Sequence, residues 1–360
     1  MRWEARHLVH NDLQERLNSI LNKRVDRKLV LGAVVNIQSR DGKFSWLEAA
    51  GDMEKDSQYL IASITKMYTA AAILKLREEG LLKLEDTISQ YLPKDLLAKI
   101  HVYKGVDYSE DLTVYQLMSH TSGLPDYFDE KNSTGKSLYQ ELLNSQDIDW
   151  SLERIVAETK IMKPHFKPGA RGKAYYSDTN YEILGKIIET VTNKKLNDVF
   201  TELIFTPLNL KSTYLYQTIS GDNLPKVYYK NKTISTPQFL FASSASGGIV
   251  SNASENMVFM KAFFNGELFP KEYLPELYKW NKLDLKMAGL EYGCGLMRCK
   301  MAKVVELFYP NLELIGHAGI SGSFAFYCPA KELFITGTLN QLARSNMPFP
   351  FMIKLLHGID

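Results

Sequence analysis

Two serine–lysine pairs in this chain have the spacing that can turn a serine into a nucleophile. Ser63 and Lys66 are three residues apart, and so are Ser133 and Lys136. On a helix this spacing puts both side chains on one face, one turn apart. A lysine desolvated in a cleft can lose its charge and accept the proton that an alcohol must give up before it attacks a carbonyl. Chance yields roughly one or two such motifs in a chain of this size, so their surroundings must separate them.

The surroundings favour Ser63. It stands between the apolar segment 59–62 and a run at 64–79 that is rich in helix formers, with Gly80 in the place of a C-cap. A serine at a helix start is close to free backbone N–H groups and to the positive end of the helix dipole. Ser133 lies in a stretch of Asn, Ser, Thr and Gly that is typical of a loop. On this motif alone, an N-capping Ser63 and a solvated Lys66 explain the pattern equally well.

Strand patterns occupy both ends of the chain, and helical patterns fill the middle. Residues 29–38 predict a buried strand, and a turn at 40–42 leads into a hairpin partner at 43–50. Near the C-terminus, strands are predicted at 303–310, 312–316, 323–329 and 332–340. Apolar residues at helical spacing predict helices around 13–21, over 181–191 and from about 348 to 356.

This order of elements predicts an α+β protein. Its antiparallel sheet would be built from the N- and C-terminal segments and flanked by helices, with a mostly helical insertion. The expected sheet domain comprises residues 1–79 and 285–360, and the expected helical domain comprises residues 80–284. Because sites favour such boundaries, we expect the active site in the cleft between the two.

Composition is that of an ordinary globular protein. The chain of 360 residues is 45% hydrophobic and 23% charged, with a formal net charge of +2, which gives no reason to expect nucleic acid or an anionic membrane as a partner. No apolar run approaches the roughly 18 residues of a membrane span. The N-terminal segment lacks the apolar core of a signal peptide. We therefore expect a cytoplasmic protein, or a periplasmic or secreted one if an export signal has been removed.

Cysteines and histidines give little support to a disulfide framework or a metal site. The three cysteines, an odd number without regular spacing, predict buried free thiols. The seven histidines are scattered, and no H-E-x-x-H motif occurs. We expect no metal and no other cofactor, and the expected partner is a small-molecule or peptide substrate.

Four further segments resemble blocks of the serine β-lactamase-like family. They are LMSHTSGLPDY at 117–127, AYYSDTNYEILGKIIE at 174–189, SASGGIVSNASENMVFMKAFFNGELF at 244–269 and GHAGISG at 316–322. They come in family order and at family-like distances, and the resemblance covers about residues 28 to 340. The family includes class C β-lactamases, D-alanyl-D-alanine peptidases, D-aminopeptidases and related esterases. This chain is similar to its tyrosine-bearing branch, and not to the enzymes that pair S-x-x-K with S-D-N and K-T-G.

The resemblance implies three catalytic residues. Ser63 would be the nucleophile and Lys66 its partner base. Tyr176 would be a second acid/base that shuttles a proton between Ser63, Lys66 and the leaving group. Tyr175 is a rival for this role, but Tyr176 stands in register with the Asp178 that follows.

Two positions depart from the family pattern. Asp178 stands where relatives more often carry Asn, which can both donate and accept a hydrogen bond, whereas an ionised aspartate only accepts. Asp178 would therefore hold Lys66 positively charged and repel an anionic substrate. Ala318 stands where relatives often carry a hydroxyl that helps to bind a substrate carboxylate, so the case for efficient hydrolysis of penicillins is weaker.

The remaining substrate-binding residues are expected in the segment 316–322. His317 takes the place of a lysine in many relatives, and it could donate or accept near neutral pH. Gly319 would let the backbone of the strand approach the substrate. The N–H groups of Ile320 and Ser63 would form an oxyanion hole. The histidine, serine, glycine and proline of the segment 117–127 are expected to be loop scaffolding.

These features favour a serine hydrolase that cleaves an ester or amide through an acyl-enzyme, with a D-amino-acid peptide as a candidate substrate. A β-lactamase proper is the second enzymatic interpretation. A catalytically weak penicillin-binding or sensor protein that keeps the fold is the third. The departures at Asp178 and Ala318 favour this third interpretation, whereas Ser63, Lys66 and Tyr176 argue against it.

The assignment of the acid/base to Tyr176 is testable with a matched pair of variants. Tyr176→Phe should lower kcat on a p-nitrophenyl ester by about 100-fold or more, the usual contribution of a general acid/base. Tyr175→Phe should cost clearly less. Equal losses in the two steady-state assays would show that the register is wrong.

Overall fold

The computed structural model describes residues 2–144, 150–217, 224–283, 289–300 and 312–359. Within them, the largest sheet is antiparallel and has the strand order β10-β11-β12-β13-β14-β15-β1-β2. Its strands are β1 (Gly32–Ser39), β2 (Ser45–Gly51), β10 (Asn281–Lys282), β11 (Leu290–Tyr292), β12 (Met297–Lys300), β13 (Glu313–Ala318), β14 (Ser323–Cys328) and β15 (Leu333–Thr338). The predicted α+β class with a sheet built from both ends of the chain is confirmed.

The two ends of the chain meet where β1 pairs with β15. Val34 lies opposite Thr338 and Ile37 opposite Ile335, so the register keeps the buried side chains of both strands on common faces. The strand predicted at 303–310 lies outside the described residues. The patterns missed β10, β11 and β12, because two to four residues are too short to show an alternation.

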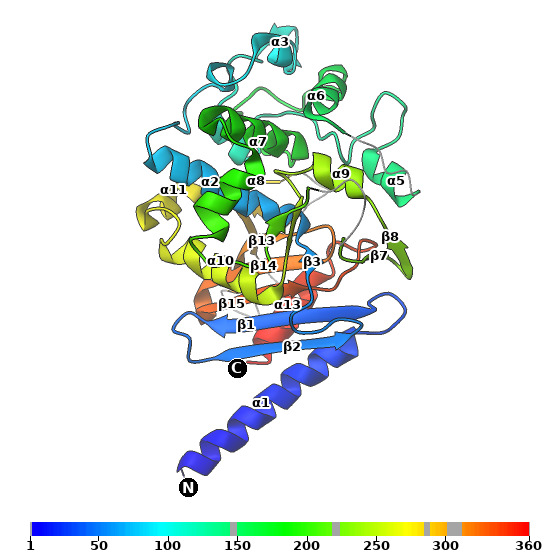
Figure 1. Cartoon of the computed structure of the whole chain (residues 1–360), viewed down its shortest axis with the longest axis vertical. Helices are drawn as coiled ribbons and strands as arrows, with labels where there is room; N and C mark the ends of the chain where they lie inside the picture. Colours follow the sequence, from blue (N-terminus) through cyan, green and yellow to red (C-terminus); the bar gives the residue numbers. More distant parts are fainter. Residues whose placement is uncertain (1, 145–149, 218–223, 284–288, 301–311, 360) are drawn as a thin grey trace.

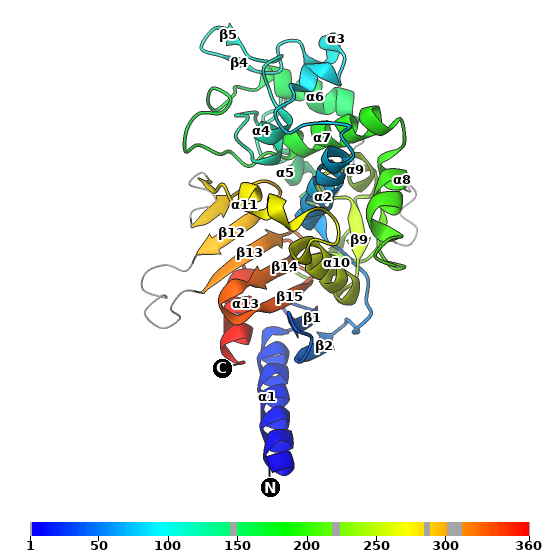
Figure 2. The same cartoon turned by 90° about the vertical axis from the view of Figure 1, so that its left-hand side faces the viewer.

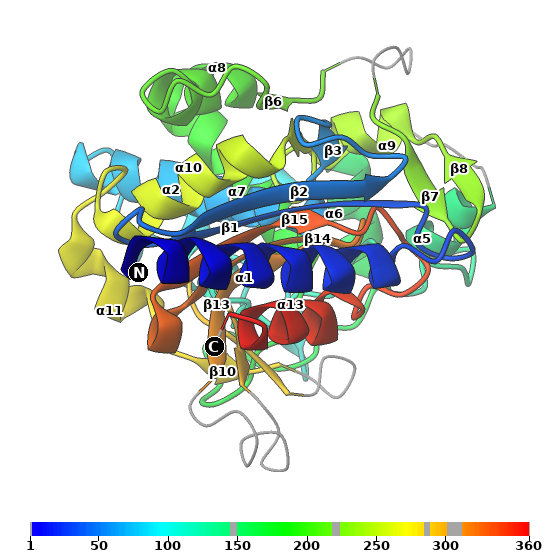
Figure 3. The ribbon, with the colours of Figure 1, turned by 90° about the horizontal axis from the view of Figure 1, so that it is seen from below.

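Alternating side chains divide the sheet between two cores. Ala33, Val35 and Ile37 of β1 belong to a core with helices α1 (Arg2–Arg24) and α13 (Pro348–His357). Val34 of the same strand belongs to the larger core, which contains α2 (Thr65–Glu78), α7 (Asp178–Thr192) and α10 (Ala253–Asn265). In Figure 1, α1 lies below β1 and β2, whereas α2, α7 and α10 lie above them; in Figure 3, α1 and α13 lie on one side of these strands and α10 lies on the other. The sheet is thus buried on both faces.

Helices dominate the part of the chain between β2 and β10. The helices there, besides α2, α7 and α10, are α3 (Lys94–Leu97), α4 (Val114–Met118), α5 (Leu138–Leu143), α6 (Leu152–Ile161), α8 (Leu196–Phe200), α9 (Pro237–Ala242) and α11 (Leu274–Leu277). Short strands lie between them: β3 (Tyr59–Leu60), β9 (Ile249–Ser251) and β6 (Tyr214–Leu215) form one sheet, β4 (Val102–Tyr103) pairs with β5 (Val106–Asp107), and β7 (Val227–Tyr229) pairs with β8 (Lys232–Ile234). Figure 2 shows this helical part stacked on the end of the large sheet.

The end of β13 approaches the small sheet closely, and a glycine makes this approach possible. A Cβ atom on Gly319 would lie 2.2 Å from Ser323 Oγ and 2.5 Å from the carbonyl oxygen of Ile61, closer than real contacts allow. The hydroxyls of Ser321 and Ser323 donate to the carbonyls of Leu60 and Ile61, each at 2.7 Å. These contacts join the large sheet to the end of β3, where α2 is about to begin.

Candidate active site

The serine expected to be the nucleophile lies on a strained turn. Ser63 is the middle residue of a 3₁₀ turn (Ala62–Ile64) between β3 and α2. Ala62 has a φ of +47°, a left-handed conformation that costs a side-chain-bearing residue roughly 1 kcal/mol. The neighbours Ala62 and Ile64 are buried, whereas Ser63 is partly exposed and lines a cleft. The turn therefore directs this one side chain towards the cleft.

Lys66 is fully buried and has polar partners on several sides. Its Nζ donates to Ser63 Oγ at 3.1 Å and to the carbonyl oxygen of Ser246 at 2.9 Å, and it forms an ion pair with Asp178 Oδ1 at 2.7 Å. Burial by itself lowers the pKa of Lys66, but the Asp178 carboxylate and the Tyr176 phenol outweigh it, and the pKa is raised. Lys66 therefore stays charged near neutral pH, as expected from the aspartate at position 178. The neutral lysine base that an S-x-x-K motif suggests does not fit this arrangement.

Tyr176 lies beside both Ser63 and Lys66. Its hydroxyl is hydrogen-bonded with their side chains, and Lys66 Nζ lies 5.0 Å from the centre of its ring. Burial raises the pKa of Tyr176 to about 12, although the nearby ammonium of Lys66 opposes this shift. The phenol is therefore protonated near neutral pH. It can donate its own proton to one group while it accepts a proton from another.

The rival Tyr175 points elsewhere. Its ring stacks on His165 with 3.4 Å between the ring centres, and its hydroxyl bonds to Glu130, which also accepts from His165 at 2.9 Å. Tyr175 lines the cleft but belongs to this separate network. The structure brings Tyr176, and not Tyr175, to Ser63.

The segment 117–127 positions Tyr176 through His120. The carbonyl of His120 accepts from the N–H of Tyr175 at 2.9 Å, and its Nδ1 accepts from the N–H of Ser177 at 3.2 Å. Its buried ring lies 4.5 Å from the ring of Tyr176, centre to centre. Burial, followed by the charge of Lys66, lowers the pKa of His120 well below its usual value, so the ring is neutral. These contacts agree with a scaffolding role.

His317 is buried behind the cleft and does not line it. Its Nδ1 lies 2.8 Å from the carbonyl of Ala318, and its Nε2 lies 3.0 Å from the hydroxyl of Tyr292. Burial, followed by the charge of Lys66, lowers the pKa of His317 to about 3. A neutral ring with a proton on Nδ1 satisfies both contacts. Both ring nitrogens are thus occupied within the protein, because this position of β13 faces away from the cleft.

The expected oxyanion residues lie at the cleft. Ala318, Gly319 and Ile320 line it together with Ser63. The close approach of Gly319 to the Ser63 turn brings the backbone of residues 318–320 alongside the nucleophile.

Glu182 is a site residue that the sequence patterns did not reveal. Its buried carboxylate accepts from the N–H groups of Ser246, at 3.1 Å, and Ala245, at 3.4 Å. It thereby holds the turn whose Ser246 carbonyl accepts from Lys66. Burial raises the pKa of Glu182 to about 7. Its spacing of four residues from Asp178 on α7 is the signal that puts both carboxylates on one helix face.

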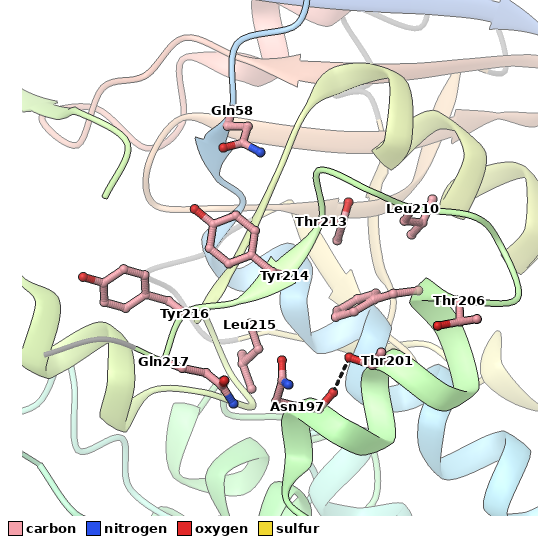
Figure 4. Close-up of a pocket in the computed structure, with 11 residues that line it drawn as sticks. Gln58, Asn197, Thr201, Thr206, Leu210, Thr213, Tyr214, Leu215, Tyr216 and Gln217 are labelled. Atoms are coloured by element: carbon pink, nitrogen blue, oxygen red, sulfur yellow. Dashed lines mark hydrogen bonds between the residues drawn. The ribbon is translucent and has the colours of Figure 1, made fainter. Parts of the chain in front are cut away.

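The cleft has a volume of about 1370 Å³. Phe128, Tyr139, Phe239 and Ile320 form one apolar side of it, which we call the aromatic wall. A second cavity, of about 710 Å³, is shown in Figure 4. The described residues that line it include neutral polar and aromatic side chains of α8, the following π-helical turn and β6, and none of them is charged. The residues that line this second cavity include no serine, lysine or carboxylate, unlike those of the cleft.

Neither a candidate metal centre nor a membrane-spanning helix is present in the part of the chain that the structure describes. No group of three His, Cys, Asp or Glu side chains is arranged to hold a metal ion there. No helix among these residues is long and apolar enough to cross a membrane.

The fold is the β-lactamase/transpeptidase-like architecture. The chain belongs to the Beta-lactamase family, whose model matches residues 17–350. The family resemblance carried by the sequence motifs is thereby confirmed.

Relatives with named activities include hydrolases. Protein flp from Staphylococcus aureus (strain MW2) is 28% identical over 68% of this chain and 48% of its own length. The D-alanyl-D-alanine-carboxypeptidase/endopeptidase AmpH from Escherichia coli (strain K12) is 25% identical over 77% of this chain and 62% of its own length. The chain thus spans about half to three fifths of these relatives. The structure of a D-stereospecific amidohydrolase from Streptomyces sp. is 26% identical, covers 97% of both chains and superimposes with a TM-score of 0.76.

The buried carboxyl of Glu182 predicts a pH-dependent stability. Because its pKa is raised on folding, its contribution is fully present below about pH 4.5 and is lost as the pH rises through about 7. The glutamine of the Glu182→Gln variant has no ionisable group, so this contribution does not change with pH in the variant. The free energy of unfolding of the variant, measured relative to the parent by urea titration, should therefore rise between pH 5 and pH 8, on the order of 3 kcal/mol. Glu189→Gln, a partly exposed carboxylate on the same helix, is the control. A difference that does not change with pH would contradict the prediction.

Proposed function

We propose that this protein cleaves an ester or amide by forming an acyl-enzyme at Ser63. The observation that carries the proposal is the contact of Ser63 Oγ with the buried, charged Lys66 at 3.1 Å, with the hydroxyl of Tyr176 beside both. A buried ammonium directed at a partly exposed serine can stabilise negative charge that develops beside it. The hydrolase relatives support the same reaction class.

In this proposal Tyr176 moves the proton and Lys66 remains a fixed cation. Ser63 Oγ attacks the carbonyl carbon and gives its proton to Tyr176 Oη, while the phenolic proton passes to the leaving nitrogen or oxygen. Lys66 stabilises the negative charge that develops on the phenol oxygen during this exchange. The N–H groups of Ser63 and Ile320 receive the oxyanion. In deacylation, water attacks the acyl carbonyl, Tyr176 takes a proton from that water, and its own proton returns to Ser63 Oγ.

A D-amino-acid peptide or amide is the candidate substrate. The names of the Streptomyces amidohydrolase and of AmpH support this class. The proposal of a β-lactamase proper has less support, because Ala318 lacks the hydroxyl that would help to bind a carboxylate and Asp178 adds negative charge. The proposal of a weak penicillin-binding or sensor protein depends on those same two residues.

The acyl-enzyme is testable by time-resolved intact-protein mass spectrometry. The panel is a penicillin, p-nitrophenyl acetate and butyrate, and a D-alanyl-D-alanine peptide. We expect a transient mass increase that maps to Ser63, absent in Ser63→Ala and retained in Ser133→Ala, the serine of the second S-x-x-K motif. No adduct and no turnover with any probe would leave the sensor interpretation in first place.

The charge state of Lys66 is testable through Asp178→Asn. Loss of the carboxylate 2.7 Å from Nζ removes the main interaction that raises the pKa of Lys66. If a charged Lys66 is required, the alkaline limb of the kcat/KM profile should move to lower pH in the variant. If Lys66 acts as a neutral base, kcat/KM at neutral pH should rise instead, which would refute the fixed-cation mechanism.

A further inference from the structure

Asp126 is a buried carboxyl in the cleft that the proposed reaction does not use. The residue is 5% exposed and lines the cleft. Its Oδ1 accepts from the N–H groups of Asp178, at 3.0 Å, and Phe128, at 3.3 Å. Within the described residues, its Oδ2 has no hydrogen-bond partner and no cationic side chain forms an ion pair with it. A buried carboxyl with a free oxygen on a cleft is a strong candidate to meet a ligand.

The charges around Asp126 favour a cation. Burial, and then the nearby carboxylate of Asp178, raises the pKa of Asp126 well above its usual range. Lys66, the cation paired with Asp178, is already in contact with Asp178 and two further acceptors. A positively charged group at Asp126 would offset both the cost of burying its carboxylate and the repulsion from Asp178, whereas an anion would increase the repulsion.

An apolar wall adjoins this carboxyl. The Phe128 whose N–H binds Asp126 stacks on Phe239, with ring centres 5.2 Å apart, and lies 5.6 Å from the ring of Tyr139. These rings belong to the aromatic wall of the cleft. A carboxyl next to aromatic rings matches an amine on a carbon that also carries an apolar side chain.

We propose that Asp126 binds a cationic amino group on the acyl part of the substrate, and that the aromatic wall holds the apolar side chain of that part. The acyl part is the part that stays on Ser63 when the leaving group departs. Asp126 lies one hydrogen bond beyond Asp178, which contacts the lysine bound to Ser63. The substrate class is then an amide or ester of an apolar α-amino acid with a free amine. This inference rests on the proposed acyl-enzyme function.

The test compares two probes that differ in the amine. They are D-phenylalanine p-nitroanilide and 3-phenylpropionic acid p-nitroanilide, which lacks the amino group. In the parent protein, kcat/KM should favour the amine at least tenfold, and Asp126→Asn should bring the ratio towards one. Asp129→Asn, which removes an exposed carboxylate from the same cleft, should keep the ratio of the parent. A parent ratio near one, or an unchanged ratio in Asp126→Asn, would overturn the inference.

Two further measurements separate the possible failures. Acylation of Ser63 by p-nitrophenyl acetate without an amine preference would refute this inference and leave the proposed function standing, whereas no acylation by any probe would refute both. If Asp126→Asn does not fold, inhibition constants measured on the parent protein provide the test. Phenethylamine should then inhibit the hydrolysis of p-nitrophenyl acetate at least tenfold more strongly than 2-phenylethanol does. Equal inhibition constants would refute the role of Asp126.

Discussion

The buried ion pair between Lys66 and Asp178 is the interaction on which the rest of the site depends. Removing an ammonium and a carboxylate from water costs several kcal/mol, and only a complete set of partners offsets this cost. Lys66 has that set: a carboxylate from α7, a carbonyl from the turn at 245–246 and the hydroxyl of Ser63. Three segments far apart in the chain must therefore be held in place together. Glu182 holds the turn, and the segment 117–127 holds the start of α7.

The fixed charge of Lys66 sets the protonation of its neighbours. Burial together with this cation keeps His120 and His317 neutral, and burial keeps the phenol of Tyr176 protonated. The site thus has one permanent cation beside a phenol that can exchange protons. The carboxyl groups of Asp126 and Asp178 lie on the cleft side of this pair, in keeping with the proposed cationic group on the substrate. A site of this kind differs from one that reads a substrate carboxylate.

Much of the fold could be predicted, because it depends on local patterns. The apolar runs of β1, β14 and β15 and the helical run of α2 are each long enough to be recognised. The strands β10 to β12 are too short for this. The direction of His317 could not be predicted, because a one-residue change of register moves a strand side chain to the opposite face. In the structure it faces Tyr292, away from the cleft.

By itself, the sequence determined the family and the antiparallel sheet made from both ends of the chain. It also determined which residue types, a serine, a lysine, a tyrosine and an aspartate, are available for the proposed reaction. The motifs around Ser63, Tyr176 and Asp178 are local, and the chemistry of their side chains can be stated without a structure. Only the tertiary structure decided which of these groups meet and in which charge state. The charge of Lys66 and the free oxygen of Asp126 arise from burial and from partners that are distant in the chain, and these appear only when the chain is folded.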